Sequence, residues 1–165
     1  MKILTNWFST FILLFIFSVL MFFLFWPFII IGDSMQNTLQ NHDRICASRL
    51  LSKFDLKRGD IIICKHGGKI IIKRIIALPS EKLSIKNNLV YINEKILNEP
   101  YVCGTTTNDI DIILNADEYF IMGDNRNFSV DSRIFAPIKK SDIVAKALFK
   151  FFPKLESINY NWEDN

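Results

Sequence analysis

The sequence lacks the cysteine spacing that a structural zinc site or a disulfide framework would need. Its three cysteines, Cys46, Cys64 and Cys103, are far apart and include no Cys-x-x-Cys pair. An odd number without such spacing argues against a zinc knuckle and against a chain fully cross-linked by disulfides. A single disulfide and isolated buried thiols both stay open. We expect neither a metal nor a cofactor.

A strong net charge is also missing. The chain carries 20 basic and 17 acidic side chains, for a net charge of +3, and no basic cluster interleaved with aromatic residues. Such a cluster is typical of nucleic-acid-binding surfaces, so we expect no nucleic-acid partner. The 165 residues suffice for one domain with its own core, even when about thirty N-terminal residues are set aside.

Charge is wholly absent from one long apolar segment, Trp7 to Ile31. As a helix, these about 25 residues would be roughly 37 Å long, enough to cross about 30 Å of hydrocarbon with some tilt. A cleaved signal peptide is the alternative, but Phe28–Ile31 is a poor small-x-small cleavage site. We therefore predict an N-terminal transmembrane helix, with a membrane anchor over residues 1–31 and a second domain over residues 32–165.

The basic residues give weak guidance on the orientation of this anchor. Lys2 is the only basic side chain before the apolar segment, and several basic residues follow it closely. A count of nearby charges would place the C-terminal side in the cytoplasm. Large folded domains, however, are often translocated regardless of charge.

After residue 35 the pattern is typical of short strands, and no helical period stands out. Two apolar runs on either side of Gly67-Gly68 predict a hairpin. Further short strands are expected between Asn-rich turns, with residues 98–117 as a long loop and residues 143–152 as a final strand. This punctuation predicts a mainly β domain, with an antiparallel sheet or a barrel-like arrangement.

Lys73 lies within the apolar run Ile70–Ile76. Alternate residues of a strand share a face, so Lys73 and Arg74 point to opposite faces. One of the two cations must then enter an apolar environment, unless the strand is at an edge. Arginine stays charged almost anywhere, whereas burial lowers the pKa of lysine, and a neutral amine can act as a general base. The alternative is a lysine whose ammonium group reaches water.

Ser34 follows the apolar segment directly, in Ile31-Gly32-Asp33-Ser34-Met35. It is either a loop serine or a nucleophile, and a nucleophilic serine needs a base. The two histidines, His42 and His66, would allow a Ser-His-Asp triad, but the residues around Ser34 do not match the nucleophile-elbow pattern. A Ser34–Lys73 dyad, a known variant of the triad, fits the composition better.

A third polar segment, residues 123–133, is dense in small and charged side chains. It is either a solvated turn closed by Asp–Arg pairs or a hydrogen-bonded shelf that orients the lysine.

Four motifs occur in this order along the chain: Gly-Asp-Ser-Met-x-x-Thr-Leu, Arg-Gly-Asp-Ile-Ile, Ile-Lys-Arg-Ile-Ile-Ala-Leu-Pro and Gly-Asp-Asn-Arg-x-x-Ser-x-Asp-Ser-Arg. Over residues 1 to about 153, the chain resembles the bacterial type I signal peptidases, or leader peptidases.

The resemblance implies a role for each matched residue. Ser34 would be the nucleophile, with its backbone N–H in the oxyanion hole, and Lys73 would be the general base. Ser129 would position the lysine, and Met35 would help to line the substrate cleft. The remaining matched residues, Asp131 and Arg133, would form a structural ion pair near the site.

The chain departs from the family pattern at three places. Gly32 stands where some members carry a serine whose hydroxyl completes the oxyanion hole, so the second donor is open. Asn37 stands where a proline is usual, which leaves the turn after Ser34 less constrained. Ser80-Glu81 replaces the usual Gly-Asp after Pro79. Because the chain is short, we expect it to lack the large extra domain of some members.

The resemblance implies a membrane-anchored serine endopeptidase that removes N-terminal signal peptides from exported proteins after small-x-small, Ala-x-Ala-like sites. Its partners would be the signal peptides of secreted preproteins, the lipid bilayer and, in an encounter, the secretion translocon. It would be a single-pass protein of the bacterial plasma membrane with its catalytic domain on the extracytoplasmic side. Two alternatives are a related Ser-Lys peptidase with one dedicated substrate set and a non-enzymatic anchored β-domain that binds a partner.

Overall fold

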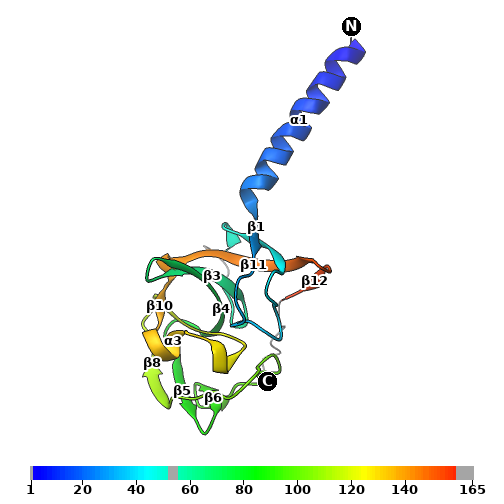
Figure 1. The fold of residues 1–165 in the computed structure, drawn as a ribbon. Coiled ribbons are helices and arrows are strands. Elements are labelled where there is room, and N and C mark those ends of the chain that lie inside the picture. The colour runs from blue at the N-terminus through cyan, green and yellow to red at the C-terminus, as the bar shows by residue number, and fades with distance from the viewer. Residues whose placement is uncertain (1, 52–55, 159–165) are drawn as a thin grey trace.

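The computed structural model of the chain describes residues 2–51 and 56–158 (Figure 1). Residues 52–55 and 159–165 of the expected second domain, and residue 1 of the expected anchor, lie outside the described residues. The helices are α1 (Lys2–Leu24), α3 (Ser132–Phe135) and the 3-10 helices η1 (Arg126–Phe128) and η2 (Lys140–Asp142). The strands are β1 (Phe25–Ile29), β2 (Arg44–Ser48), β3 (Ile61–His66), β4 (Lys69–Ala77), β5 (Lys82–Lys86), β6 (Leu89–Ile92), β7 (Lys95–Ile96), β8 (Ile110–Ile113), β9 (Glu118–Met122), β10 (Ile138–Lys139), β11 (Ile143–Phe152) and β12 (Glu156–Ser157).

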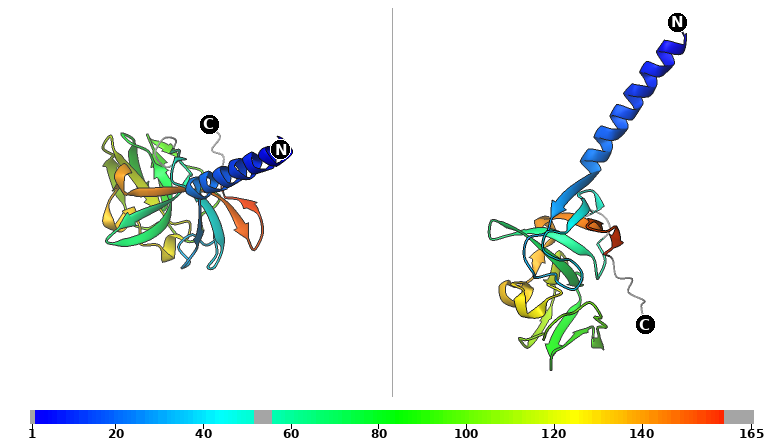
Figure 2. Two further views of the ribbon diagram at one scale, coloured as in Figure 1. Left: turned by 90° about the horizontal axis from the view of Figure 1, so that it is seen from above. Right: turned by 45° about the vertical axis from the view of Figure 1, so that its right-hand side comes forward.

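Helix α1 projects away from the β domain in all three views (Figures 1 and 2). The described side chains from Trp7 to Val19 are exposed. The prediction of one helix over Trp7–Ile31 is wrong at its C-terminal end, because the helix stops at Leu24 and β1 follows. Pro27 explains the stop, since proline lacks the N–H of a helix and disfavours helical geometry in the residue before it.

Within residues 2–51 and 56–158, no helix is long and apolar enough to span a bilayer. The transmembrane part of the predicted fold is therefore not confirmed.

The larger sheet has eight strands in the order β1-β2-β11-β3-β4-β9-β10, with β12 paired to β11. Every strand pair in it is antiparallel. The hairpin predicted around Gly67-Gly68 is confirmed as β3–β4, and both glycines have positive φ. The final strand predicted over residues 143–152 is confirmed as β11, which pairs with β2 on one side and β3 on the other. The sheet brings β4 close to the segment that follows β1.

The smaller sheet has the antiparallel order β7-β6-β5-β8. Its tight turns use positive φ at Asn87, Asn88 and Asn93, as the Asn-rich sequence predicts. The long loop predicted over residues 98–117 is wrong in part, because Ile110–Ile113 forms β8 and pairs with β5. The partner strand of β8 lies more than twenty residues earlier in the chain, so the local pattern of four residues carries little of this information. The mainly β, antiparallel fold class is confirmed.

Three apolar clusters support the two sheets. The first includes side chains of β2, β3 and β11 together with Met35 and Leu39, which are 1% and 0% exposed. The second lies against the smaller sheet, and the third lies around β3, β4 and β9. Burial of Met35 and Leu39 holds the segment that carries Ser34 against the first cluster.

Candidate active site

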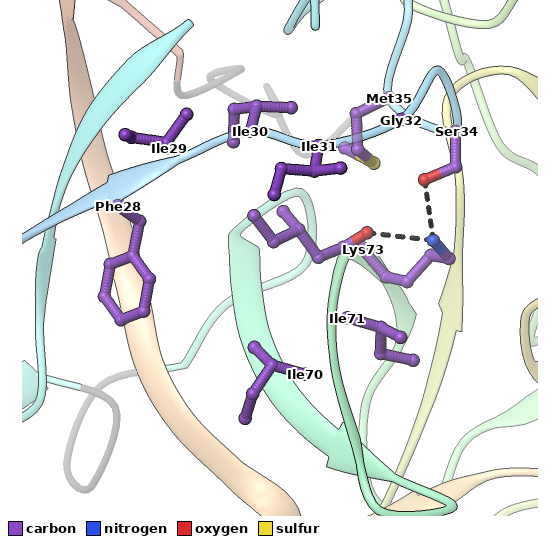
Figure 3. Close-up of a pocket in the computed structure, with 11 residues that line it drawn as sticks. Phe28, Ile29, Ile30, Ile31, Gly32, Ser34, Met35, Ile70, Ile71 and Lys73 are labelled. Atoms are coloured by element: carbon purple, nitrogen blue, oxygen red, sulfur yellow. Dashed lines mark hydrogen bonds between the residues drawn. The ribbon is translucent and has the colours of Figure 1, made fainter. Parts of the chain in front are cut away.

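Ser34 lies in a compact turn between β1 and β2. The N–H groups of Thr38 and Leu39 both donate to the carbonyl of Met35, at 3.1 and 2.8 Å. Gly32 enters the turn with φ of +100°, a conformation that L side chains rarely adopt. The turn therefore has internal hydrogen bonds and two buried apolar anchors, and it presents the Ser34 side chain toward β4 (Figure 3).

The Ser34 and Lys73 side chains meet in this region. Lys73 Nζ lies 2.8 Å from Ser34 Oγ and donates a second hydrogen bond, of 3.0 Å, to the carbonyl of Ile72. Lys73 is only 4% exposed, so the alternative of an ammonium group in water is wrong. Burial lowers the pKa of Lys73, and the nearby carboxylate of Asp131 acts in the opposite direction. This environment favours the neutral amine that a general base requires.

Neither histidine replaces the lysine as a partner of Ser34. His66 stacks on Phe135 with ring centroids 3.8 Å apart, and His42 is exposed at a turn. Among the described residues, no hydrogen bond joins either histidine to Ser34. The geometry supports a Ser34–Lys73 pair rather than a Ser-His-Asp triad.

Arg74 points to the opposite face of β4 and is also buried, at 1% exposure. Its guanidinium bonds Asp124 through two hydrogen bonds, Nε to Oδ1 at 2.8 Å and Nη2 to Oδ2 at 2.6 Å. From the sequence, at least one of the two cations is expected in an apolar environment, and in the structure both are buried. Asp124 was not predicted as the counter-ion of Arg74, although both residues lie within the quoted motifs.

Much of the segment 123–133 is a buried shelf rather than a solvated turn, although Phe128 and Val130 within it are exposed. Asp124, Asn125 and Arg126 are at most 4% exposed. The expected pair of Asp131 and Arg133 is present, with Nε–Oδ1 and Nη2–Oδ2 distances of 2.8 and 2.9 Å.

The carboxylate of Asp131 is further held by a backbone hydrogen bond. The N–H of Gly123 donates to Asp131 Oδ2 at 3.0 Å. Burial alone would raise the pKa of Asp131, but the Arg133 guanidinium, the nearby Ser129 hydroxyl and the Gly123 N–H hold it below its ordinary value. Asp131 is therefore a charged, well-satisfied group that stabilises the shelf.

Gly123 lies where the shelf meets the turn of residues 32–39, which carries Ser34 and is called the nucleophile turn below. A Cβ atom at this residue would be 2.4 Å from the carbonyl oxygen of Ser34 and 2.3 Å from Ser129 Oγ. The carbonyl of Ser34 also accepts a hydrogen bond of 3.1 Å from the N–H of Asn125. The backbone of the shelf therefore packs directly on Ser34.

Ser129 is buried at 7% exposure beside Gly123. Its Oγ has no hydrogen-bond partner within the described ranges. The hydrogen bond to Lys73 that the family resemblance implies is thus not formed in this structure. Ser129 nevertheless places an unused hydroxyl in the interior of the site.

A cleft of about 300 Å³ opens next to Ser34 and Lys73 (Figure 3). Residues 28–32 line one wall, residues 70–73 line the other, and Ser34 and Met35 lie at the end. Met35 is among the residues that line this cleft, and its contribution to substrate binding stays a prediction. The lining is mainly isoleucine and other apolar side chains, which suits an uncharged, extended ligand.

In the part of the chain that the structure describes, no three His, Cys, Asp or Glu side chains are grouped to hold a metal ion. Cys46, Cys64 and Cys103 are free thiols, and burial raises the pKa of Cys64 to about 12. The lining residues of the cleft include the hydroxyl of Ser34 and the amine of Lys73.

Comparison with known proteins gives consistent matches. A family model described as "Signal peptidase, peptidase S26" matches residues 4–152. Signal peptidase I of Bacillus amyloliquefaciens is 36% identical over 144 aligned positions, and the match covers 79% of this chain and 78% of that protein. Signal peptidase IB of Staphylococcus aureus strain MRSA252 is 31% identical over 165 aligned positions, gaps included, and the match covers 86% of each chain.

A solved structure is similar as well. The crystal structure of a signal peptidase I from Enterococcus faecalis V583 matches with a TM-score of 0.52 and 28% identity. The match covers 55% of this chain and 95% of that chain.

Proposed function

Because the chain belongs to the signal peptidase family, peptidase S26, and to the signal peptidase I class of enzymes, we propose that Ser34 and Lys73 carry out its peptide cleavage. The observation that carries this proposal is the 2.8 Å contact between Lys73 Nζ and Ser34 Oγ at a buried lysine. The substrate would be a preprotein, cut between its signal peptide and its mature part.

Acylation follows from the state of the two side chains. The neutral amine of Lys73 accepts the proton of Ser34 Oγ as that oxygen attacks the scissile carbonyl carbon. The tetrahedral intermediate then collapses, the peptide C–N bond breaks, and the Lys73 ammonium returns the proton to the leaving amine. The products of this half-reaction are the free mature protein and an ester between Ser34 and the signal peptide.

Deacylation uses the same base. Lys73 accepts a proton from a water molecule, the resulting hydroxide attacks the ester, and Ser34 leaves as its alcohol with the proton from Lys73. The backbone N–H of Ser34 would donate to the oxyanion in both steps. Gly32 has no side chain that could supply a second donor, so that donor must come from elsewhere.

The shelf would keep the lysine oriented through these steps. Asp131 and Arg133 stabilise it by their two hydrogen bonds, and Gly123 brings it against Ser34. The unpaired Ser129 Oγ supports a role in holding Lys73 once the amine has become protonated, because an ammonium group needs acceptors that a neutral amine does not.

The cleft supports an extended peptide as the ligand. Strand β9 pairs with β4 from Arg74 onward, which leaves the edge of residues 70–73 available to a further strand. A signal peptide could pair with this edge by backbone hydrogen bonds, while side-chain pockets select particular residues. Because the bulky side chains of Met35 and the isoleucines line the cleft, small residues such as alanine would be favoured at the first and third positions before the cut.

Helix α1 would associate with the membrane. Its exposed apolar side chains between Trp7 and Val19 support this location, because such a surface is rarely left in water. We propose a bacterial plasma-membrane protein whose β domain lies on the extracytoplasmic side, where signal peptides leave the bilayer and the translocon. Protease added to intact spheroplasts should digest the β domain, and protection of this domain would refute the orientation.

The cleavage proposal is tested with the full chain in detergent and a preprotein reporter that carries an Ala-x-Ala site. Wild type should cut after the second alanine, whereas Ser34→Ala and Lys73→Met should be inactive although folded by circular dichroism. A folded Lys73→Met variant with full activity would show that another group is the base. A folded wild type that binds the reporter without cutting it would support a binding module instead.

A further inference from the structure

The hydroxyl of Thr38 connects the nucleophile turn to the buried ion pair beside Lys73. Thr38 Oγ1 donates a hydrogen bond to Asp124 Oδ2 and accepts one of 3.0 Å from Arg74 Nη2. Thr38 lies four residues after Ser34, within the same turn. One side chain of that turn therefore contacts both members of the ion pair.

The Arg74–Asp124 pair is held in place by further contacts of Arg74. In addition to its two bonds with Asp124, Arg74 donates a hydrogen bond of 2.8 Å from Nη1 to the carbonyl of Gly59. Its guanidinium also lies 4.1 Å from the ring centroid of Tyr101. Arg74 and Asp124 are 1% and 0% exposed, so neither side chain has room to change its conformation.

Each member of the pair is also the chain neighbour of a residue that contacts Ser34. Arg74 follows Lys73, whose Nζ lies 2.8 Å from Ser34 Oγ. Asp124 precedes Asn125, whose N–H donates to the Ser34 carbonyl at 3.1 Å. Thr38 is thus linked to Ser34 by two sets of contacts. One set runs through Arg74 and Lys73 of β4, and the other runs through Asp124 and Asn125 of the shelf.

We propose that Thr38 is a positioning residue that sets the distance between Ser34 Oγ and Lys73 Nζ, although it touches neither atom. This inference rests on the proposed function of the Ser34–Lys73 pair. Without the hydroxyl, Asp124 and Arg74 each lose a buried hydrogen-bond partner, and the turn loses its side-chain link to β4. Proton transfer depends steeply on such distances, so the loss acts on the chemical step rather than on peptide binding.

The test compares Thr38→Val, which removes the hydroxyl at nearly constant shape, with Thr38→Ser, which restores it. Thr106→Val is a matched control. The Thr106 hydroxyl is buried and accepts from Arg126, which is paired with Glu99, so this variant removes a buried hydroxyl–guanidinium hydrogen bond that does not involve residues 34–39. If Thr38→Val does not fold, Thr38→Ala takes its place, because the space it leaves admits a water and softens the loss.

Two measurements are made on the full chain in detergent. The first is kcat and KM on the Ala-x-Ala preprotein reporter, and the second is amide hydrogen exchange of residues 34–39. We expect Thr38→Val to lower kcat by roughly tenfold or more with KM within about twofold, and to accelerate exchange in the turn. Thr38→Ser and Thr106→Val should keep kcat and turn exchange close to wild type.

Unchanged kcat in a folded Thr38→Val variant would overturn the inference, as would an equal loss of kcat in Thr106→Val. Failure of the proposed function is a separate result, because it would appear as cleavage by Ser34→Ala or Lys73→Met. In that case the exchange measurement still decides the inference. Turn exchange that does not differ between Thr38→Val and wild type would show that the hydroxyl does not hold the turn.

Discussion

Lys73 and Arg74 are consecutive residues of β4 and are both buried, but among the described residues only Arg74 forms an ion pair with a carboxylate. Arg74 has a carboxylate partner in Asp124, at a closest distance of 2.6 Å. Lys73 makes its hydrogen bonds to the Ser34 hydroxyl and the Ile72 carbonyl, which are uncharged. The first cation is stabilised as an ion, and the second is pushed toward its neutral form. One strand thus supplies a structural cation on one face and a candidate base on the other.

The pH dependence of cleavage should report this difference. Since Lys73 acts when neutral and its pKa is lowered by burial, kcat/KM should rise through one ionisation that lies below the ordinary lysine value of about 10.4. The measurement is kcat/KM of the full chain across the pH range in which it stays folded. An ionisation at the ordinary lysine value would contradict the desolvated base.

Asp131 provides a second pH prediction, this time for stability. Its pKa is lowered in the folded state, so its contribution is complete above the ordinary aspartate value of about 3.9 and is lost as the pH falls through the folded-state pKa. Asp131→Asn leaves Arg133 buried without its counter-ion and should cost about 3–5 kcal/mol near neutral pH. Denaturant unfolding should show this difference shrinking below about pH 4.

A surface carboxylate gives the control for Asp131. Asp111 pairs with Lys86 at 3.6 Å, and both side chains are about half exposed. Asp111→Asn should therefore change the free energy of unfolding by less than about 1 kcal/mol. If both variants lost the same stability, or if the Asp131→Asn difference did not depend on pH, the assigned role of the Asp131–Arg133 pair would be wrong.

Gly123→Ala tests the contact between the shelf and the nucleophile turn. The added Cβ would overlap the Ser34 carbonyl and the Ser129 side chain, so the shelf and the Ser34 backbone can no longer pack as closely. We expect kcat to fall by roughly a hundredfold, with the protein still folded. Gly68→Ala is the comparison, because its Cβ enters open space at the β3–β4 turn and only its positive φ carries a cost. Normal kcat in Gly123→Ala would refute the close contact.

Asn37→Pro tests one departure from the family pattern. Asn37 has φ of +96°, whereas proline is restricted to about −65°, so the family's usual residue does not fit this backbone. The change also removes the 3.2 Å hydrogen bond from Asn37 Nδ2 to the Tyr101 carbonyl. We expect a loss of about 2–3 kcal/mol in unfolding free energy, measured by denaturant titration.

Asn37→Gly separates the two contributions at this residue. Glycine accepts the positive φ but lacks the amide, so it should lose only about 1 kcal/mol. A proline variant as stable as wild type would mean that this turn adopts the family's more constrained form in solution.

Several features could be predicted from the sequence because they depend on local pattern. Alternating apolar residues, paired glycines and Asn-rich turns predicted the β3–β4 hairpin, the tight turns of the smaller sheet and β11. The order of four motifs identified the family and the candidate residues Ser34 and Lys73. Pro27 marked the end of the N-terminal helix, although the prediction extended the helix past it to Ile31.

Other features were decided only by the tertiary structure, because they depend on pairing between distant segments. Strand β8 exists because β5 offers it an edge, which four residues of sequence do not reveal. Lys73 is buried, and within reach of a serine 39 positions earlier, only because β4 and the nucleophile turn pack together. The chain sequence determined which reactive groups are present, and the packing of the sheets determined their separation and their solvation, on which the pKa of Lys73 depends.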